Sequence, residues 1–197
     1  MTKQTPQQFA DAVRTSIAEN YNTFQSKGRI ISDYQGEESL RKAYEGRQLL
    51  EMLQNADDAG AKAVNINLDR QRKCVSFSNT GVPFSAAGIA SLMVRNLSTK
   101  RGKKNFIGNK GLGFRSLLNW ATRILIHSHG NSLEFSHEIA RREFLALVPD
   151  QAERAAMLKA GNYPPGATTF PFLGIPEISP NPEQIAPWDT VVEIFYS

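Results

Sequence analysis

The chain has 197 residues, of which 41% are hydrophobic and 21% are charged, and its formal net charge is +4. This is an ordinary globular composition with enough length for a substantial core, and no apolar run approaches the roughly 18 residues of a membrane span, which excludes a membrane protein. The polar N-terminus is not a secretory signal, and a single cysteine, Cys74, excludes an intramolecular disulfide; both features favour a cytoplasmic protein.

The first predicted helix begins at a clear start signal. Thr5 precedes Pro6, which is the arrangement of a capping residue followed by proline at the first helical position. Phe9, Val13 and Ile17 then recur at four-residue spacing. This spacing predicts a helix with one apolar face.

The next segment is predicted to contain a connector and a second helix. Residues 21–37 resemble a connector with a short apolar centre. We expect the helix to begin near Glu38 or Ser39 and to continue to Ala59, because Gly60 can adopt the left-handed conformation that ends a helix.

A β-hairpin is predicted after this helix. The stretches "AVNINLD" at 63–69 and "KCVSFSN" at 73–79 alternate between apolar and polar residues and are joined by three polar residues. The stretch "TGVPFS" at 80–85 is typical of a turn, and Ser85 is expected to cap a short helix that continues to about Val94.

The remaining elements follow a glycine-bearing basic loop. In chain order we predict a loop at 95–113, a short helix at 114–121, strands at 123–129 and 132–139, a helix at 150–160, a proline-rich loop at 161–187 and a strand at 189–197. Because the last strand continues into the C-terminus, we expect a fragment of a longer protein.

Together these elements predict an α+β fold, a two-layer sandwich of helices on a mixed β-sheet. We divide the chain into an N-terminal helix with its connector, residues 1–37, and a main domain, residues 38–197.

One predicted helix has a polar side that its surroundings do not explain. Glu51, Asn55 and Asp58 occur at i, i+4 and i+7 in "LLEMLQNADDAGA" at 49–61, so they share one face of an otherwise largely apolar helix.

A second stretch indicates an anion site. "IGNKGLGFRS" at 107–116 places Gly108, Gly111 and Gly113 directly before a helix, where backbone N–H groups and the helix dipole favour a phosphate. Residues 95–115 contain seven Lys or Arg residues and no acid, which also favours an anionic ligand. The pattern is neither a P-loop nor a Rossmann fingerprint.

The order of four motifs resembles the GHKL ATPase superfamily, which includes DNA gyrase, the large heat-shock chaperone, histidine kinases and MutL. Within it, the sequence is most similar to the ATP-binding modules of the sacsin and NO VEIN type. The resemblance is carried by Leu53–Ala59, Asn79–Phe84, Ser98–Lys100 and Ile107–Ser116. It implies a Bergerat-type ATP-binding fold with ATP and Mg²⁺ as cofactors.

The resemblance also implies roles for the polar helix residues. Glu51 matches the general base that activates water for attack on the γ-phosphate, and Asn55 matches the magnesium ligand. Asp58 is expected one turn further on, near the ribose or the waters of the metal.

At the base end of the nucleotide, Asn79 occupies the position where most family members have an aspartate. Its amide can still accept from the adenine amine, but a flipped amide would fit guanine, so we expect weaker selection of adenine. Gly81 would lie close to the base. Thr190 is our choice for the threonine that completes this site, with Thr168 and Thr169 as competing candidates.

The phosphates are expected at the glycine-rich motif and the basic loop, which resembles an ATP lid. The implied phosphate-binding residues are Lys100, Gly108, Lys110, Gly111, Leu112, Gly113 and Phe114.

Three hypotheses about the function follow from these implications. The chain is a Mg²⁺-dependent ATPase module of a longer chaperone-like or defence-type protein, with ATP, ADP and the remaining domains as its partners. Alternatively, it is a nucleotide-binding switch with negligible hydrolysis in isolation. A nucleic-acid-binding domain is disfavoured because no aromatic stacking platform accompanies the basic loop. The sequence leaves open whether the chain forms a homodimer.

Overall fold

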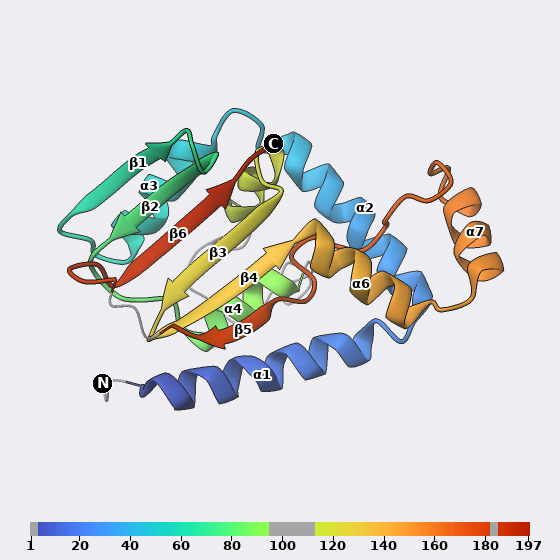
Figure 1. The fold of residues 1–197 in the computed structure, drawn as a ribbon, viewed down its shortest axis with the longest axis horizontal. Coiled ribbons are helices and arrows are strands. Elements are labelled where there is room, and N and C mark those ends of the chain that lie inside the picture. Colours follow the sequence, from blue (N-terminus) through green and yellow to red (C-terminus); the bar gives the residue numbers. More distant parts are fainter. Residues whose placement is uncertain (1–3, 95–112, 182–184) are drawn as a thin grey trace, which may run out of the picture.

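The sheet and its covering helices are clear in the computed structural model, which describes residues 4–94, 113–181 and 185–197. The described residues form one six-stranded sheet with the order β1-β2-β6-β3-β4-β5 (Figure 1). The strands, in that spatial order, are β1 (Val64–Asp69), β2 (Cys74–Asn79), β6 (Thr190–Phe195), β3 (Arg123–Ser128), β4 (Asn131–Ser136) and β5 (Glu177–Pro180). The α+β sandwich is therefore confirmed. The sheet was predicted to be mixed, but every described strand pair is antiparallel.

One face of this sheet is apolar because the register aligns the apolar residues of successive strands. Phe77 is paired with Val192, Val192 with Ile126, and Ile126 with Leu133. All four side chains are buried in the main core, together with residues of the helical layer. The alternation that predicted the strands thus also determines which face meets the helices.

Helices cover this face and one end of the sheet. They are α1 (Pro6–Thr23), α2 (Lys27–Ala43), α3 (Gln48–Asp58), α4 (Ala86–Met93), η2 (Arg115–Asn119, a 3₁₀ helix), α6 (His137–Leu147) and α7 (Gln151–Ala160). Figure 1 shows α3 behind β1 and β2, α4 behind β4 and β5, and α1 along the β5 edge. None of the described helices is both long and apolar enough to span a bilayer.

Several predicted boundaries are confirmed by their capping contacts. The Thr5 side chain accepts a hydrogen bond from the backbone N–H of Gln8, which begins α1. Ser85 caps α4 in the same way through Gly88. Gly60 has a φ of +68° directly after α3, as expected for the end of a helix.

The connector predicted at 21–37 is wrong, because α2 begins at Lys27. The single helix predicted from Glu38 to Ala59 is also wrong: α2 ends at Ala43, and α3 begins at Gln48 after a turn in which Gly46 has a φ of +80°. The division of the chain at residue 37 stays a prediction, although α2 crosses it.

Two elements were not predicted. The strand expected at 132–139 ends at Ser136, whose side chain caps α6 by accepting from the N–H of Ile139. Within the expected loop at 161–187, β5 forms the edge strand beside β4.

A smaller apolar cluster joins α6 to the end of α1 and the start of α2, and it includes Phe24, Ile30 and Phe144.

Candidate functional site

The polar side of α3 lies beside its buried side. Met52 and Ala56 are buried, and Met52 packs in the main core. Glu51 and Asn55 each precede one of these residues, so they lie at the margin of the core and are half-buried. Asp58 is exposed. The two residues with the most specific predicted roles are thus held in place by the packing of their neighbours.

Glu51 lies directly against Gly113, the last glycine of the glycine-rich motif. A Cβ built on Gly113 would lie 1.9 Å from Oε2 of Glu51 and 2.8 Å from its Cδ. Gly113 is buried, so the carboxylate occupies the space that any larger residue would need. The predicted general base and the predicted phosphate-binding segment therefore meet in the fold.

Phe114 anchors this segment to the core. Its ring is fully buried and meets the ring of Phe84 edge-on, with the ring centroids 6.3 Å apart. Phe84 ends the motif that begins at Asn79. The aromatic contact therefore joins the glycine-rich motif to the motif predicted to bind the base.

Asn79 and Thr190 lie opposite each other on neighbouring strands. They are paired in the register of β2 and β6, and Thr190 is buried. The Asn79 amide nitrogen donates to the carbonyl oxygen of Thr80 at 2.9 Å. In this orientation the amide oxygen of Asn79 points its acceptor capacity away from this contact, and the expected weaker selection of adenine stays a prediction.

Gly81 follows in a conformation that side chains rarely adopt. Its φ is +117°, and an added Cβ would lie 2.5 Å from the carbonyl oxygen of Ala59. Its N–H donates to Oδ2 of Asp189 at 2.9 Å. The turn after β2 is thus closely packed between the end of α3 and the start of β6.

The other threonine candidates lie elsewhere. Thr168 lines a cavity between α2 and α6, and Thr169 is fully buried in the same segment. Thr190 alone of the three is paired with Asn79.

Five predicted phosphate-binding residues lie outside the described residues. They are Lys100, Gly108, Lys110, Gly111 and Leu112. Within the described ranges, no group of three or more His, Cys, Asp or Glu side chains could hold a metal ion. A Mg²⁺ ion that keeps several waters and binds phosphate oxygens needs no such group, and the Asn55 amide oxygen is a suitable ligand for it.

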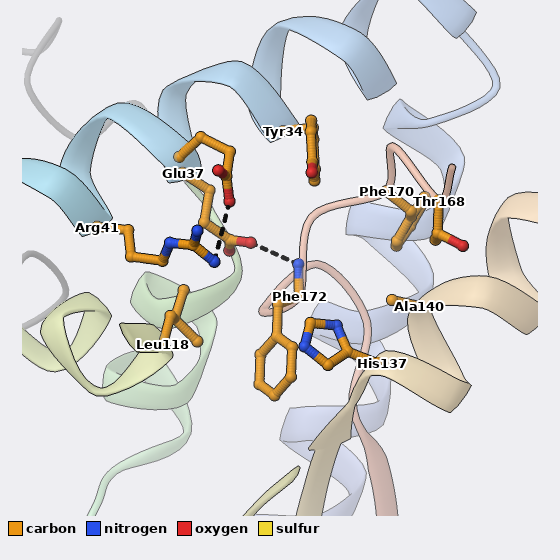
Figure 2. A pocket seen from close by; sticks show the side chains of 10 residues that line it. Tyr34, Glu37, Arg41, Leu118, His137, Ala140, Thr168, Phe170 and Phe172 are labelled. Carbon is orange, nitrogen blue, oxygen red and sulfur yellow. Dashed lines mark hydrogen bonds and ion pairs between the residues drawn. The ribbon is translucent and has the colours of Figure 1, made fainter. Parts of the chain in front are cut away.

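A separate cavity of about 70 Å³ lies between α2, α6 and the segment 168–172. Figure 2 shows Glu37 extending from α2 toward the backbone of Phe172. The Glu37 carboxylate accepts from the N–H of Phe172 at 2.5 Å and from that of Leu173 at 3.1 Å. Burial raises the pKa of Glu37 to about 7, although these two donors and the charge of Arg115 lower it.

Sequence reasoning missed two residues around these sites. Asp189 directly precedes Thr190 in the sequence, and this neighbourhood to a candidate site residue was the only feature that could have drawn attention to it. Glu37 fell in the expected connector, where nothing marked it as buried. Arg115 is also buried, and it donates to the carbonyl oxygen of Leu92 at 2.8 Å.

Comparison with known proteins gives two matches. A family model described as a histidine kinase-, DNA gyrase B- and HSP90-like ATPase matches residues 46–154. Among curated proteins, the chain is similar to Protein NO VEIN of Arabidopsis thaliana, with 29% identity over 104 residues. This alignment covers 51% of the chain but only 4% of NO VEIN, so the chain spans a small part of that relative.

Proposed function

Because the chain belongs to the histidine kinase-, DNA gyrase B- and HSP90-like ATPase family, we propose that this NO VEIN-like ATP-binding module hydrolyses ATP with Glu51 as general base and with Mg²⁺ as cofactor. The observation that carries the proposal is the contact between Glu51 and Gly113. It brings a half-buried carboxylate to the segment whose backbone suits phosphates. A carboxylate in that position can order a water and accept its proton.

The Asn55 amide is our candidate for the magnesium ligand. It lies one turn after Glu51 on the same side of α3 and is also half-buried. A neutral oxygen ligand suits an ion whose other ligands are waters and phosphate oxygens. When bound, Mg²⁺ would neutralise part of the phosphate charge. Asp58 is exposed at the end of α3, where it can contact the ribose or waters of the ion.

The base of ATP would bind at the other end, between β2 and β6. Asn79 offers its amide oxygen to the adenine amine, and Thr190 offers a hydroxyl from the paired strand. Gly81 keeps the backbone close because no side chain fits there. The phosphates would then extend toward Gly113 and Phe114. The other proposed phosphate-binding residues, Lys100, Gly108, Lys110, Gly111 and Leu112, lie outside the described residues.

We further propose that the module works within a longer chaperone-like or defence-type protein, in which hydrolysis drives a conformational change. The similarity to NO VEIN, a far longer protein, supports this context. The partners would be the remaining domains of that protein. A homodimer is an alternative.

The test is calorimetric titration of the chain with ATP and ADP, with and without Mg²⁺, together with phosphate-release assays. We expect binding that Mg²⁺ strengthens, and slow release of phosphate. Glu51→Gln should keep the ATP affinity within about threefold and lower phosphate release by at least about 100-fold, because a general base typically contributes that much or more.

Glu138→Gln is a matched control, because Glu138 is an exposed carboxylate in the first turn of α6 and should affect neither quantity. Undiminished phosphate release by Glu51→Gln would refute the assignment of the base. Binding without any release by the unaltered chain would favour the switch function, and absence of binding would overturn both.

A further inference from the structure

The turn at Gly81 is fixed on one side by the connection between α3 and β1. The N–H of Val82 donates to the carbonyl oxygen of Ala59 at 2.8 Å. The Thr80 hydroxyl accepts from the N–H groups of Lys62 and Ala63, both at 3.0 Å. These contacts hold the outer side of the turn and do not involve β6.

Asp189 fixes the other side of the turn through two contacts. Its N–H donates to the carbonyl oxygen of Asn79 at 3.0 Å, and its Oδ2 accepts from the N–H of Gly81 at 2.9 Å. A single residue thus bonds to both ends of the three-residue segment Asn79–Gly81. Because Thr190 comes next in the chain, these contacts also determine how far β6 extends along β2.

The charge of Asp189 suits the base end of a nucleotide rather than its phosphate end. None of the ion pairs within the described parts of the chain involves this residue. A carboxylate beside the ligand repels phosphate, whereas an adenine ring carries no charge to repel. A nucleotide is therefore favoured in the orientation with its base beside Thr190.

We propose that Asp189 is a positioning residue for nucleotide recognition, which clamps the Gly81 turn onto β6 and so holds Asn79 and Thr190 at the spacing that an adenine base requires. This inference rests on the proposed function, because it assumes that the site binds ATP. The role is indirect: Asp189 acts through the backbone of Gly81 and Asn79. Its loss should therefore affect the recognition of the base and leave the recognition of the phosphates unchanged.

The experiment compares Asp189→Ala and Asp189→Asn with the unaltered chain by titration with ATP and with inorganic tripolyphosphate, which has no base. Asp189→Ala should weaken ATP binding by about tenfold, as expected for the loss of a hydrogen bond to a charged acceptor. Its affinity for tripolyphosphate should not change. Asp189→Asn should recover most of the ATP affinity, because the amide oxygen can still accept from Gly81.

Asp69→Ala is the matched control. Asp69 lies at the far end of the same hairpin, where its Oδ1 accepts from the N–H groups of Gln71 and Arg72 at 3.0 and 2.9 Å. This variant removes a carboxylate of the same kind from a similar turn and should bind ATP as the unaltered chain does. Hydrogen exchange gives a second readout: the Gly81 amide should lose protection in Asp189→Ala and keep it in Asp189→Asn.

The outcomes separate the inference from the function on which it depends. If the unaltered chain binds ATP and Asp189→Ala binds it equally well, the inference is wrong and the proposed function stands. An equal loss of ATP and tripolyphosphate binding also overturns it, since that would indicate general damage to the site. If the unaltered chain binds no ATP, the proposed function and the inference both fail.

Discussion

At Gly113 the backbone passes so close to Glu51 that one methyl group cannot be added without moving the carboxylate. Cβ of Glu51 would also lie 3.3 Å from the added atom, so turning the carboxylate away would remove the two closest contacts and leave a tight one. The absence of a side chain at Gly113 therefore allows the Glu51 carboxylate to occupy this place. A residue that is part of a phosphate motif in the sequence thus also determines the position of the predicted base.

Gly113→Ala should consequently lower both stability and activity. We expect the free energy of unfolding to fall by about 1–3 kcal/mol, because overpacking forces neighbouring side chains out of place. Any phosphate release should fall by about 100-fold, since a displacement of about 1 Å at a reacting group can have that effect. Urea unfolding and phosphate-release assays measure the two effects.

Gly28→Ala is the control for this prediction, because a Cβ at Gly28 would meet nothing within 4 Å. It should leave phosphate release unchanged and should not reduce stability. Equal stability of Gly113→Ala and the unaltered chain would show that the contact with Glu51 does not constrain the fold.

The individual site residues differ in how far they could be predicted from the sequence. The sequence favours Thr190 over Thr168 and Thr169 because a strand follows it at once. The register pairs it with Asn79, and its role in binding the base stays a prediction. The contact of Asp189 with Gly81 could not be foreseen, since it depends on the alignment of β6 with β2 across more than 100 residues of chain. Local patterns predict which residues end a strand, but not which backbone groups they meet.

At the scale of whole elements, Glu37 links α2 to the segment that precedes β5. Its carboxylate serves two backbone donors, which would otherwise be buried without partners. The stripe that α2 buries is Ile30, Asp33 and Glu37, so two of its three residues are acidic. Apolar periodicity could not reveal this helix, because the residues it buries are mostly not apolar.

The raised pKa of Glu37 predicts a specific dependence of stability on pH. The pKa of the carboxyl is about 7 in the folded state, whereas its ordinary value, 4.5, applies to the unfolded state. Its contribution to stability is therefore complete below pH 4.5 and is lost as the pH rises through about 7. From the size of the shift this loss is about 3 kcal/mol. The groups that act on Glu37 are Arg115 on η2, Glu38 on α2 and the N–H donors of Phe172 and Leu173.

Glu37→Gln cannot titrate and should remove this loss. The free energy of unfolding, measured by urea titration at several pH values between 4.5 and 8, should fall less with rising pH for Glu37→Gln than for the unaltered chain. Glu19→Gln is the control, because Glu19 is an exposed carboxylate on α1 and is not among the groups that act on Glu37; its profile should follow that of the unaltered chain. Parallel profiles for Glu37→Gln and the unaltered chain would contradict the prediction.

Two further elements show why element boundaries were harder to predict than strand pairs. Ser136 is both the last residue of β4 and the cap of α6, so the strand pattern continues into the helix without a turn that would separate them. The short strand β5 ends at Pro180 on the sheet edge, where a proline need not donate to a neighbour. The hairpin of β1 and β2 had neither complication and is confirmed almost to the residue.

At the scale of the whole molecule, and within the part of the chain that the structure describes, the apolar face of the sheet extends further than the helices that cover it. Ile66 on β1 is paired with Phe77 and continues the buried row of Phe77, Val192, Ile126 and Leu133, but it is 45% exposed. Leucines of α3 are exposed as well. Six aliphatic side chains of these two elements have exposed fractions between 40% and 52%: Leu49, Leu50, Leu53, Val64, Ile66 and Leu68. We call these six residues the β1 surface.

The β1 surface coincides with the free edge of the sheet, and this combination predicts self-association of the isolated chain. Between Val64 and Asp69, β1 contains no proline and no lysine, which commonly protect an edge strand. Two copies paired through β1 in antiparallel fashion would join their apolar rows on the same face.

Ile66→Lys should therefore lower the fraction of dimer measured by sedimentation at high concentration. It should change the free energy of unfolding by no more than about 0.5 kcal/mol, as is typical of surface sites. Leu145→Lys alters an exposed leucine on α6 and should leave association unchanged. If the chain stays monomeric up to millimolar concentrations, or if both variants associate equally, the edge of β1 is not the surface through which copies meet.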